Sequence, residues 1–356
     1  MKKLLLGIAA VCLAGFTFAQ DAPLWMRHSV ISPDGTTIAF TYKGDIYTVP
    51  VAGGRAMQIT TNPAYDTAPV WSPDSKRIAF ASDRMGSLDV YIVAKDGGEP
   101  RRLTTHSGSE TPLAFTDAGH VLFSAGIMPS AEAVVFPSNG QFNQVYRVSV
   151  EGGRPTMISS MPMECISINK EGAMLYQDKK GYEDYWRKHH VSPIARDIWM
   201  YTPGKEPQYR QLTTFGGEDR EPVWAPDGKT FYYLSEENGS FNIYRRTPGD
   251  AKAVQLTHYT KNPVRYLSAA TDGRLCYGFD GEIYTLLPGG EAQKVNISIV
   301  SDRNDKDIIR QIKSSGATEM AVSPDGKEVA FVLRGDVYVT SVEYKTTKQI
   351  TNTPCQ

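Results

Sequence analysis

The sequence predicts an all-β fold, a β-propeller made of four-stranded blades. Three observations carry this prediction. A turn motif recurs along the chain, a strand that carries an aromatic residue follows each turn motif, and a closing strand ends most units. Each unit therefore consists of four short strands. The turns recur at intervals of roughly 40 to 57 residues, which is typical of propeller blades.

The clearest copy of the turn motif lies in residues 68–80 (APVWSPDSKRIAF), where an apolar strand, a tight turn and a second apolar strand follow one another. Pro73 fixes φ at a value that suits the turn, and Asp74 can accept hydrogen bonds from the next backbone amides. We expect this capping role, and no metal ligation, for Asp74, Asp227 and Asp325. The markers of the seven units are Asp34, Asp74, Asp117, Asn169, Asp227, Asp272 and Asp325.

The other two strands of each unit repeat as well. The third strand begins at residues 45–47, 89–91, 144–146, 197–199, 242–244, 282–284 and 336–338, and five units end in a closing strand at 58–60, 102–104, 211–213, 255–257 and 349–351. Strands favour such β-branched and aromatic residues. We expect the Tyr and Trp side chains of the first and third strands to form the core between blades.

The repeats divide the chain into four parts. Residues 1–19 read as a secretory signal peptide cleaved after Ala19, which predicts an exported, periplasmic protein. Units one to six predict a six-bladed propeller over 20–297, followed by a charged connector over 298–316 without the turn motif. Unit seven, 317–356, is then the first blade of a second, truncated propeller; the alternative is one seven-bladed ring. Residues 349–354 parallel 58–63, which bridge units one and two, so the sequence indicates the N-terminal part of a longer protein.

Composition restricts the partners. The chain has 356 residues, 41% of them hydrophobic, and a formal net charge of −1, which does not suggest a nucleic-acid partner. After the signal segment, no apolar run is long enough to span a membrane. The mature chain keeps Cys165, Cys276 and Cys355, an odd number that implies no disulfide framework.

The sequence shows no catalytic centre. It has neither a G-x-S-x-G elbow nor an H-E-x-x-H zinc motif, so we expect no catalytic residue, no metal and no cofactor. His189 and His190 stand near Glu183 and Asp184, but adjacent residues of an extended backbone point to opposite faces. A packed insertion, Gly181 to Pro193, which could contact a neighbouring domain, explains them better.

The candidate binding residues precede the first strand of each blade, which lines the central axis of a propeller. Alignment of the marker turns places Arg27, Thr67, Glu110, Arg220 and Arg265 at one position of the channel mouth. Several Arg residues in a ring could bind a peptide carboxylate through bidentate hydrogen bonds. The alternative is that these are solvated loop charges.

The units resemble the Pro-Asp-Gly type of WD40-like repeat found in tricorn-type proteases, in TolB and in the propellers of prolyl oligopeptidase and dipeptidyl peptidase relatives. The segment 24–35 (LWMRHSVISPDG) and the order of six blades, a connector and a further blade are similar to the N-terminal region of tricorn protease homologues. The resemblance implies the non-catalytic propeller part of an exported serine peptidase, which gates or channels peptides. The implied partners are peptides and a downstream peptidase domain of the same parent chain.

Two other functions stay open at this point: a TolB-like periplasmic interaction scaffold, and the propeller of a dipeptidyl-peptidase-like hydrolase. Whether this chain is an enzyme by itself, and whether it forms a homo-oligomer, also stay open.

Overall fold

The structure is a computed structural model that describes residues 23–126, 142–181, 191–300, 315–344 and 346–351. The expected signal peptide lies outside the described residues, as does most of the expected connector. The same holds for residues 182–190 of the expected insertion, which include His189, His190 and their acidic neighbours, and for Cys355.

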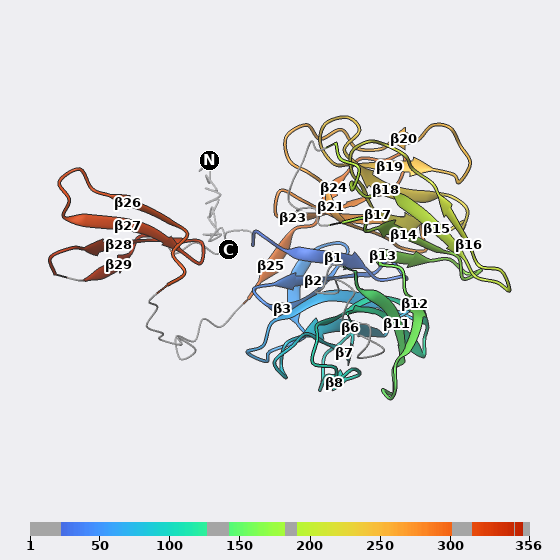
Figure 1. The fold of residues 1–356 in the computed structure, drawn as a ribbon, viewed down its shortest axis with the longest axis horizontal. Coiled ribbons are helices and arrows are strands. Elements are labelled where there is room, and N and C mark those ends of the chain that lie inside the picture. Colours follow the sequence, from blue (N-terminus) through green and yellow to red (C-terminus); the bar gives the residue numbers. More distant parts are fainter. Residues whose placement is uncertain (1–22, 127–141, 182–190, 301–314, 345, 352–356) are drawn as a thin grey trace, which may run out of the picture.

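The described chain is all-β, as the sequence predicts, and its strands form seven sheets (Figure 1). Each sheet consists of four consecutive antiparallel strands, and we number the sheets 1 to 7 in chain order. Sheets 1 to 3 contain β1 (Arg27–Ile31), β2 (Thr37–Tyr42), β3 (Asp45–Pro50), β4 (Gly54–Gln58), β5 (Asp66–Trp71), β6 (Arg77–Ser82), β7 (Asp89–Ala94), β8 (Arg101–Arg102), β9 (Glu110–Asp117), β10 (His120–Ala125), β11 (Gln144–Ser149) and β12 (Thr156–Ser159).

Sheets 4 to 7 repeat the same up-and-down order. They contain β13 (Met163–Ile168), β14 (Met174–Asp178), β15 (Ile198–Thr202), β16 (Gln208–Gln211), β17 (Asp219–Trp224), β18 (Phe231–Ser235), β19 (Asn242–Arg246), β20 (Val254–Gln255), β21 (Arg265–Ala269), β22 (Leu275–Phe279), β23 (Glu282–Leu286), β24 (Gln293–Lys294), β26 (Glu319–Val322), β27 (Glu328–Leu333), β28 (Asp336–Ser341) and β29 (Thr347–Gln349).

Sheets 1 to 6 form a circle. Their first strands lie against one another in the order β1, β5, β9, β13, β17 and β21, and β21 lies against β1 again. Hydrogen bonds join the first and sixth sheets: among them, the Ile31 amide donates to Ser268 Oγ at 3.1 Å, and the Met26 amide donates to the Gly281 carbonyl at 3.2 Å. This arrangement accords with the predicted six-bladed unit, while the boundaries 20–297, 298–316 and 317–356 stay predictions.

A fifth strand completes sheet 1. β25 (Ile297–Ile299) follows sheet 6 in sequence and pairs in parallel with β4, at the outer edge of the first sheet. Gly53, which has a φ of 85°, makes room for this strand, because a Cβ at Gly53 would lie 2.6 Å from the Asn296 carbonyl oxygen. The chain therefore returns to its first sheet after the sixth.

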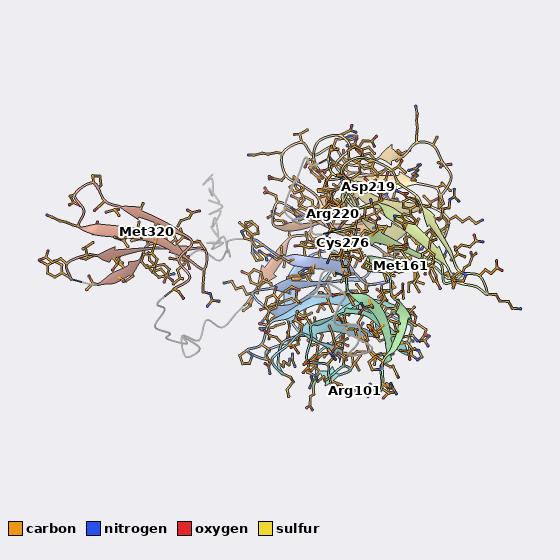
Figure 2. All side chains as sticks on the ribbon, in the orientation of Figure 1. Arg101, Met161, Asp219, Arg220, Cys276 and Met320 are labelled. Carbon is orange, nitrogen blue, oxygen red and sulfur yellow. The ribbon has the colours of Figure 1, made fainter. Side chains whose placement is uncertain are left out.

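Aromatic side chains form the core of the sheets, as the sequence predicts. Within sheets 1, 2 and 3 the third-strand Tyr stacks on a second-strand Phe, with ring centroids 5.6 to 5.9 Å apart. Trp71 and Trp224 join neighbouring sheets, because each indole nitrogen donates to a carbonyl of the preceding sheet. Figure 2 shows how densely side chains fill this body.

The repeated polar residues satisfy the backbone. Asp74 Oδ1 accepts from the Lys76 amide at 3.2 Å, and Asp227 Oδ1 accepts from the Lys229 amide at 2.8 Å, which confirms the capping role. The Thr of the closing strand accepts from a third-strand amide, for example Ile243 to Thr257 Oγ1 at 2.9 Å. The same bond occurs in sheets 1, 2, 4 and 7.

Sheet 7 carries the blade pattern but is poorly covered. Phe331 stacks on Tyr338 as in the other sheets, yet Met320 and Tyr344 are each 73% exposed. Figure 1 shows this sheet apart from the other six. Across the described residues, no helix has the length and apolar character needed to cross a membrane.

Candidate axial site

A recurring backbone feature shapes the axis of the ring. In the first strands of sheets 1, 2, 4, 5 and 6 the pairing with the second strand shifts at a β-bulge. The first bulged residue has a positive φ in each case: His28 (49°), Ala68 (52°), Cys165 (53°), Glu221 (50°) and Tyr266 (58°). We call these five residues the axial bulges.

The residue types at the axial bulges follow from the backbone. A positive φ is unfavourable for β-branched side chains, and none of the five is β-branched. Sheet 3 has Pro112 at this position, and proline cannot adopt a positive φ. The register of β9 accordingly shifts elsewhere, at Leu113 and at Thr116.

Three of the axial bulges, His28, Glu221 and Tyr266, contact residues of neighbouring sheets. His28 lies against Tyr266, with ring centroids 5.0 Å apart, and its Nδ1 is 3.1 Å from Thr67 Oγ1. Glu221 joins three sheets, because its amide donates to Gln177 Oε1 at 2.9 Å and its Oε2 accepts from the Leu267 amide at 2.7 Å. The polar atoms at the axis therefore belong to a network and hold neighbouring sheets together.

Burial sets the ionisation of these residues. Burial, followed by the charge of Arg27, lowers the pKa of His28 to about 4, so the imidazole is neutral at pH 7. Burial raises the pKa of Tyr266 to about 12. Burial also raises the pKa of Cys165 well above its usual value, and the carboxylates of Glu221 and Glu164 add to this effect.

Cys165 is exposed to solvent although burial raises the pKa of its thiol. Protein surrounds its thiol closely enough to raise the pKa, yet the side chain is exposed. Both observations hold if the thiol faces an interior space that water can enter. Thiolates, not thiols, act as nucleophiles, so Cys165 is a poor nucleophile at neutral pH.

The predicted site residues lie at two neighbouring positions. Arg27, Thr67, Arg220 and Arg265 pair with equivalent second-strand residues, directly before the axial bulges. Glu110 lies one residue earlier, because it pairs with Ala125, and Thr111 occupies the aligned position in sheet 3. The alignment of Glu110 with the other four was therefore wrong by one residue.

Sheet 4 adds Glu164 to this ring of first-strand residues, and the sequence did not indicate it. Its carboxylate interacts with Arg196, with Lys179 and with Gln177. Burial would raise the pKa of Glu164, but these partners outweigh burial and hold the pKa below its usual value. The fourth unit has the weak marker Asn169, so its first strand was not aligned with the others.

The predicted residues differ in exposure. Glu110 and Arg220 are 1% and 2% exposed, and Arg220 Nε donates to Glu218 at 2.7 Å (Figure 2). Arg27 and Arg265, on the adjacent sheets 1 and 6, are half-buried. Burial raises the pKa of Tyr266, and the charges of both guanidinium groups oppose this effect.

A small hollow of about 30 Å³ lies beside Arg27, and Trp25, Lys43 and Tyr65 are among the residues that line it. The guanidinium carbon of Arg27 is 5.9 Å from the centre of the Trp25 ring. The hollow has room for about one water molecule, so it is a surface feature and not a ligand cavity.

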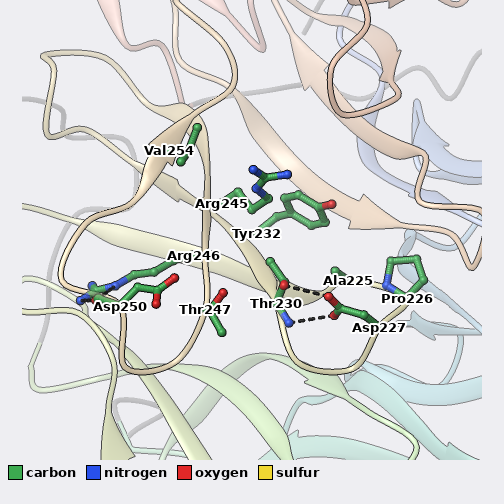
Figure 3. A pocket seen from close by; sticks show the side chains of 10 residues that line it. All are labelled: Ala225, Pro226, Asp227, Thr230, Tyr232, Arg245, Arg246, Thr247, Asp250 and Val254. Carbon is green, nitrogen blue, oxygen red and sulfur yellow. Dashed lines mark hydrogen bonds between the residues drawn. The ribbon is translucent and has the colours of Figure 1, made fainter.

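A larger hollow lies in sheet 5 (Figure 3). Its volume is about 470 Å³, and the marker turn and the turn between β19 and β20 line it. Some of its polar groups bond to each other: Thr230 Oγ1 donates to Asp227 at 2.8 Å, and Arg246 donates twice to the Asp250 carbonyl. The sequence did not single out this hollow.

The described residues bring one hydroxyl group and an imidazole together at the axis. Thr67 and His28 are in contact, but this imidazole is a weak base and no carboxylate orients it among the described residues. Nor do three His, Cys, Asp or Glu side chains come together there as metal ligands.

The fold and its axis define a class of protein: a β-propeller whose interior carries polar residues and a solvent-accessible thiol. The model of the tricorn protease N-terminal β-propeller domain matches residues 23–292. The chain belongs to this family, as the resemblance of its repeats predicted.

Relatives of known sequence and structure agree. Tricorn protease homolog 1 of Streptomyces coelicolor is 26% identical over 289 residues, which are 80% of this chain and 26% of that protein. Tricorn protease of Thermoplasma acidophilum is 25% identical over 333 residues, 90% of this chain and 29% of that protein. A crystal structure of the tricorn protease superposes with a TM-score of 0.64 at 19% identity, over 93% of this chain and 32% of that one, which shows the shared fold. The chain thus spans less than a third of the length of these relatives.

Proposed function

We propose that this propeller guides peptides along its axis toward a serine peptidase domain of the same parent protein. The chain is the N-terminal propeller of a tricorn-like protease. Chemistry at the axis supports guidance and not catalysis, because the thiol of Cys165 stays protonated and His28 is a weak base.

One observation carries the proposal: Arg27 and Arg265 are half-buried and directly precede His28 and Tyr266, whose rings lie 5.0 Å apart on adjacent sheets. Two guanidinium groups at neighbouring positions of the ring suit the carboxylate end of a peptide, since each can form bidentate hydrogen bonds. Arg220 and Glu110 support the surrounding wall in this proposal, because both are buried.

The test compares peptide binding by the full chain and by the double variant Arg27→Ala/Arg265→Ala. Fluorescence anisotropy with labelled tetrapeptides, as free acids and as C-terminal amides, gives the affinity. We expect the native chain to prefer the free acid, and the double variant to lose this preference with at least a tenfold weaker affinity. The control variant Arg147→Ala/Arg210→Ala removes two exposed charges from β11 and β16 and leaves the preference intact. Equal affinity of the native chain for the free acid and the amide would refute the proposal that Arg27 and Arg265 bind the peptide carboxylate.

We also infer that the protein is exported to the periplasm. The charged start and apolar run of residues 1–19 support this inference. Mass spectrometry of the protein from a periplasmic extract tests it, with Gln20 as the expected first residue. A chain that keeps residues 1–19 and stays in the cytoplasm would contradict it.

A further inference from the structure

One backbone hydrogen bond recurs where consecutive sheets of the ring meet. At five of these contacts, which we call seams, the amide near the start of a first strand donates to a carbonyl of the preceding sheet, at 2.6 to 3.2 Å. The five bonds are Asp66 to Gly44, Glu110 to Leu88, Asp219 to Arg196, Val264 to Phe241 and Met26 to Gly281.

At four seams the acceptor is the residue directly before the third strand, and at the other it is Arg196, two residues before β15. The bond therefore brings the residue after the acceptor close to the donor residue. At three seams both side chains are acids, and we call these the acid seams: Asp45 with Asp66, Asp89 with Glu110, and Asp197 with Asp219. At the other two, the control seams, Asn242 meets Val264 and Glu282 meets Met26.

Five of the six carboxyl groups of the acid seams are buried, and the sixth, Asp45, is half-buried. Asp66 and Asp89 are fully buried, and Glu110 and Asp219 are 1% exposed. Each of these four carboxyl groups has at least one oxygen that accepts no hydrogen bond of good geometry among the described residues. A buried carboxylate is costly unless it is paired or protonated.

Each acid seam has one cation for two acids. Arg84 contacts Asp66 at 2.8 Å, Arg102 contacts Asp89 at 2.9 Å, and Lys180 contacts Asp197 at 2.5 Å. At the first two acid seams, two carboxylates and one cation leave a net charge of −1, and one bound proton removes it. At the third, Lys180 also lies 3.5 Å from Asp178, so one bound proton reduces the excess negative charge.

We propose that each acid seam holds one proton between its two carboxyl groups in mild acid, and that loss of this proton toward neutral pH loosens the ring at these seams and not at the control seams. The proposal does not depend on peptide binding, because it concerns contacts between sheets.

The electrostatics of each pair agree with this proposal. Burial, assisted by the neighbouring acid, raises the pKa of Asp45 to about 6, of Glu110 to about 7 and of Asp219 to about 7. Hydroxyl groups act against burial and more strongly than the neighbouring acid, because their hydrogen bonds lower the pKa: Thr60 at Asp45, Thr104 at Glu110, and Ser235 and Thr213 at Asp219. Smaller effects come from Gln58 and Arg84 at Asp45, from the His106 amide at Glu110 and from Glu237 at Asp219. Asp178 also lies beside Lys180.

The sign of the effect follows from linkage. A folded-state pKa above the unfolded value means that the closed seam keeps a proton that the opened seam releases. Stability from this proton is complete below the unfolded pKa, near 4, and is lost as the pH rises through 6 to 7. The equilibrium for opening therefore rises by up to about tenfold per pH unit in this window and levels off above pH 7.

Hydrogen exchange of the five seam amides tests the proposal on the full chain. Exchange is followed between pH 4.5 and 8 and corrected for the intrinsic pH dependence of amide exchange. We expect the Asp66, Glu110 and Asp219 amides to lose roughly a hundredfold in protection up to pH 7, while those of Met26 and Val264 stay constant. The same loss at all five amides, or a constant protection at the acid seams, would overturn the proposal.

A substitution then assigns the effect to one seam. Glu110→Gln keeps the size of the side chain and removes the titratable group, so the Glu110-position amide should become insensitive to pH while Asp66 and Asp219 respond as before. Asp89→Asn is the second variant and should give the same result from the other side of the pair. An unchanged pH response at this amide in both variants would show that the carboxyl pair is not its cause.

Discussion

The indole nitrogen of Trp224 donates a 3.1 Å hydrogen bond to the carbonyl of Ala173, and so joins sheet 5 to sheet 4 through a buried polar contact. Trp71 makes the equivalent bond to Val30 at 3.0 Å between sheets 2 and 1. The same residue type thus fixes the spacing of two pairs of neighbouring sheets.

Replacement of Trp224 by Phe should destabilise the ring by about 1–3 kcal/mol, because the Ala173 carbonyl keeps the Asn169 amide but loses its second donor, and the smaller ring fills the buried site less well. Urea unfolding followed by circular dichroism measures the change in the free energy of unfolding. Trp25→Phe serves as the control, because Trp25 is 49% exposed. This variant should have the same urea midpoint as the native protein. Equal midpoints for both variants would show that the indole bond does not contribute.

The closing-strand threonine offers a second test. Thr257→Val keeps the shape of the side chain but leaves the buried Ile243 amide without its acceptor, so we expect a loss of about 1–3 kcal/mol. The matched variant Thr351→Val removes the same bond to Val337 from sheet 7, where it is part-buried. The main unfolding transition should stay where it is in Thr351→Val, and a shift as large as that of Thr257→Val would tie sheet 7 to the stability of the ring.

The thiols report on access to the axis. Cys165 is exposed to an interior space and Cys276 is fully buried. Small methanethiosulfonate reagents should therefore modify Cys165 in the folded chain, slowly at pH 7 because its pKa is raised, and faster as the pH rises. Peptide mapping by mass spectrometry reads each cysteine separately. Modification of Cys276 before unfolding would contradict the buried placement.

His28 should stay neutral far into the acid range. Its pKa of about 4 lies below the usual 6.5, so the folded state resists a proton that the unfolded state accepts. The stability linked to His28 is complete above pH 6.5 and falls as the pH drops toward 4. Nuclear magnetic resonance of the ring protons measures the titration directly, and a midpoint near 6.5 would place His28 in solvent.

The effects of His28 and of the acid seams have opposite signs over the same pH range. The global free energy of unfolding is therefore expected to change less with pH than the exchange of single seam amides. This difference is the reason to test the seams by local exchange.

The sequence was sufficient for the fold because each repeat carries its own turn and strand residues. Asp74 and Thr257, for example, act on amides within their own sheets, so short-range pattern predicted their positions. The contact of Trp71 involves only the neighbouring unit, because its indole nitrogen donates to Val30 of the preceding sheet. All these contacts recur from unit to unit, and repetition distinguishes them from chance.

The axial site was harder to predict because it depends on register. A positive φ at Cys165 or Glu221 is not tied to glycine, and the shift that puts Glu110 one residue ahead needs the pairing of β9 with β10. One signal was present: Pro69 and Pro222 stand directly after two of the axial bulges, and proline within a sheet favours a bulge.

The parallel pairing of β25 with β4 has a consequence for biosynthesis. The two strands meet through residues as far apart as Gly54 and Ser298, which are 244 positions apart in the chain. A ribosome must therefore translate all six sheets before the outer edge of the first one gains its neighbour, and until then β4 presents an unpaired strand to other chains. Folding of this ring is thus expected to finish late and slowly, with the growing chain most prone to aggregation just before its last contact forms.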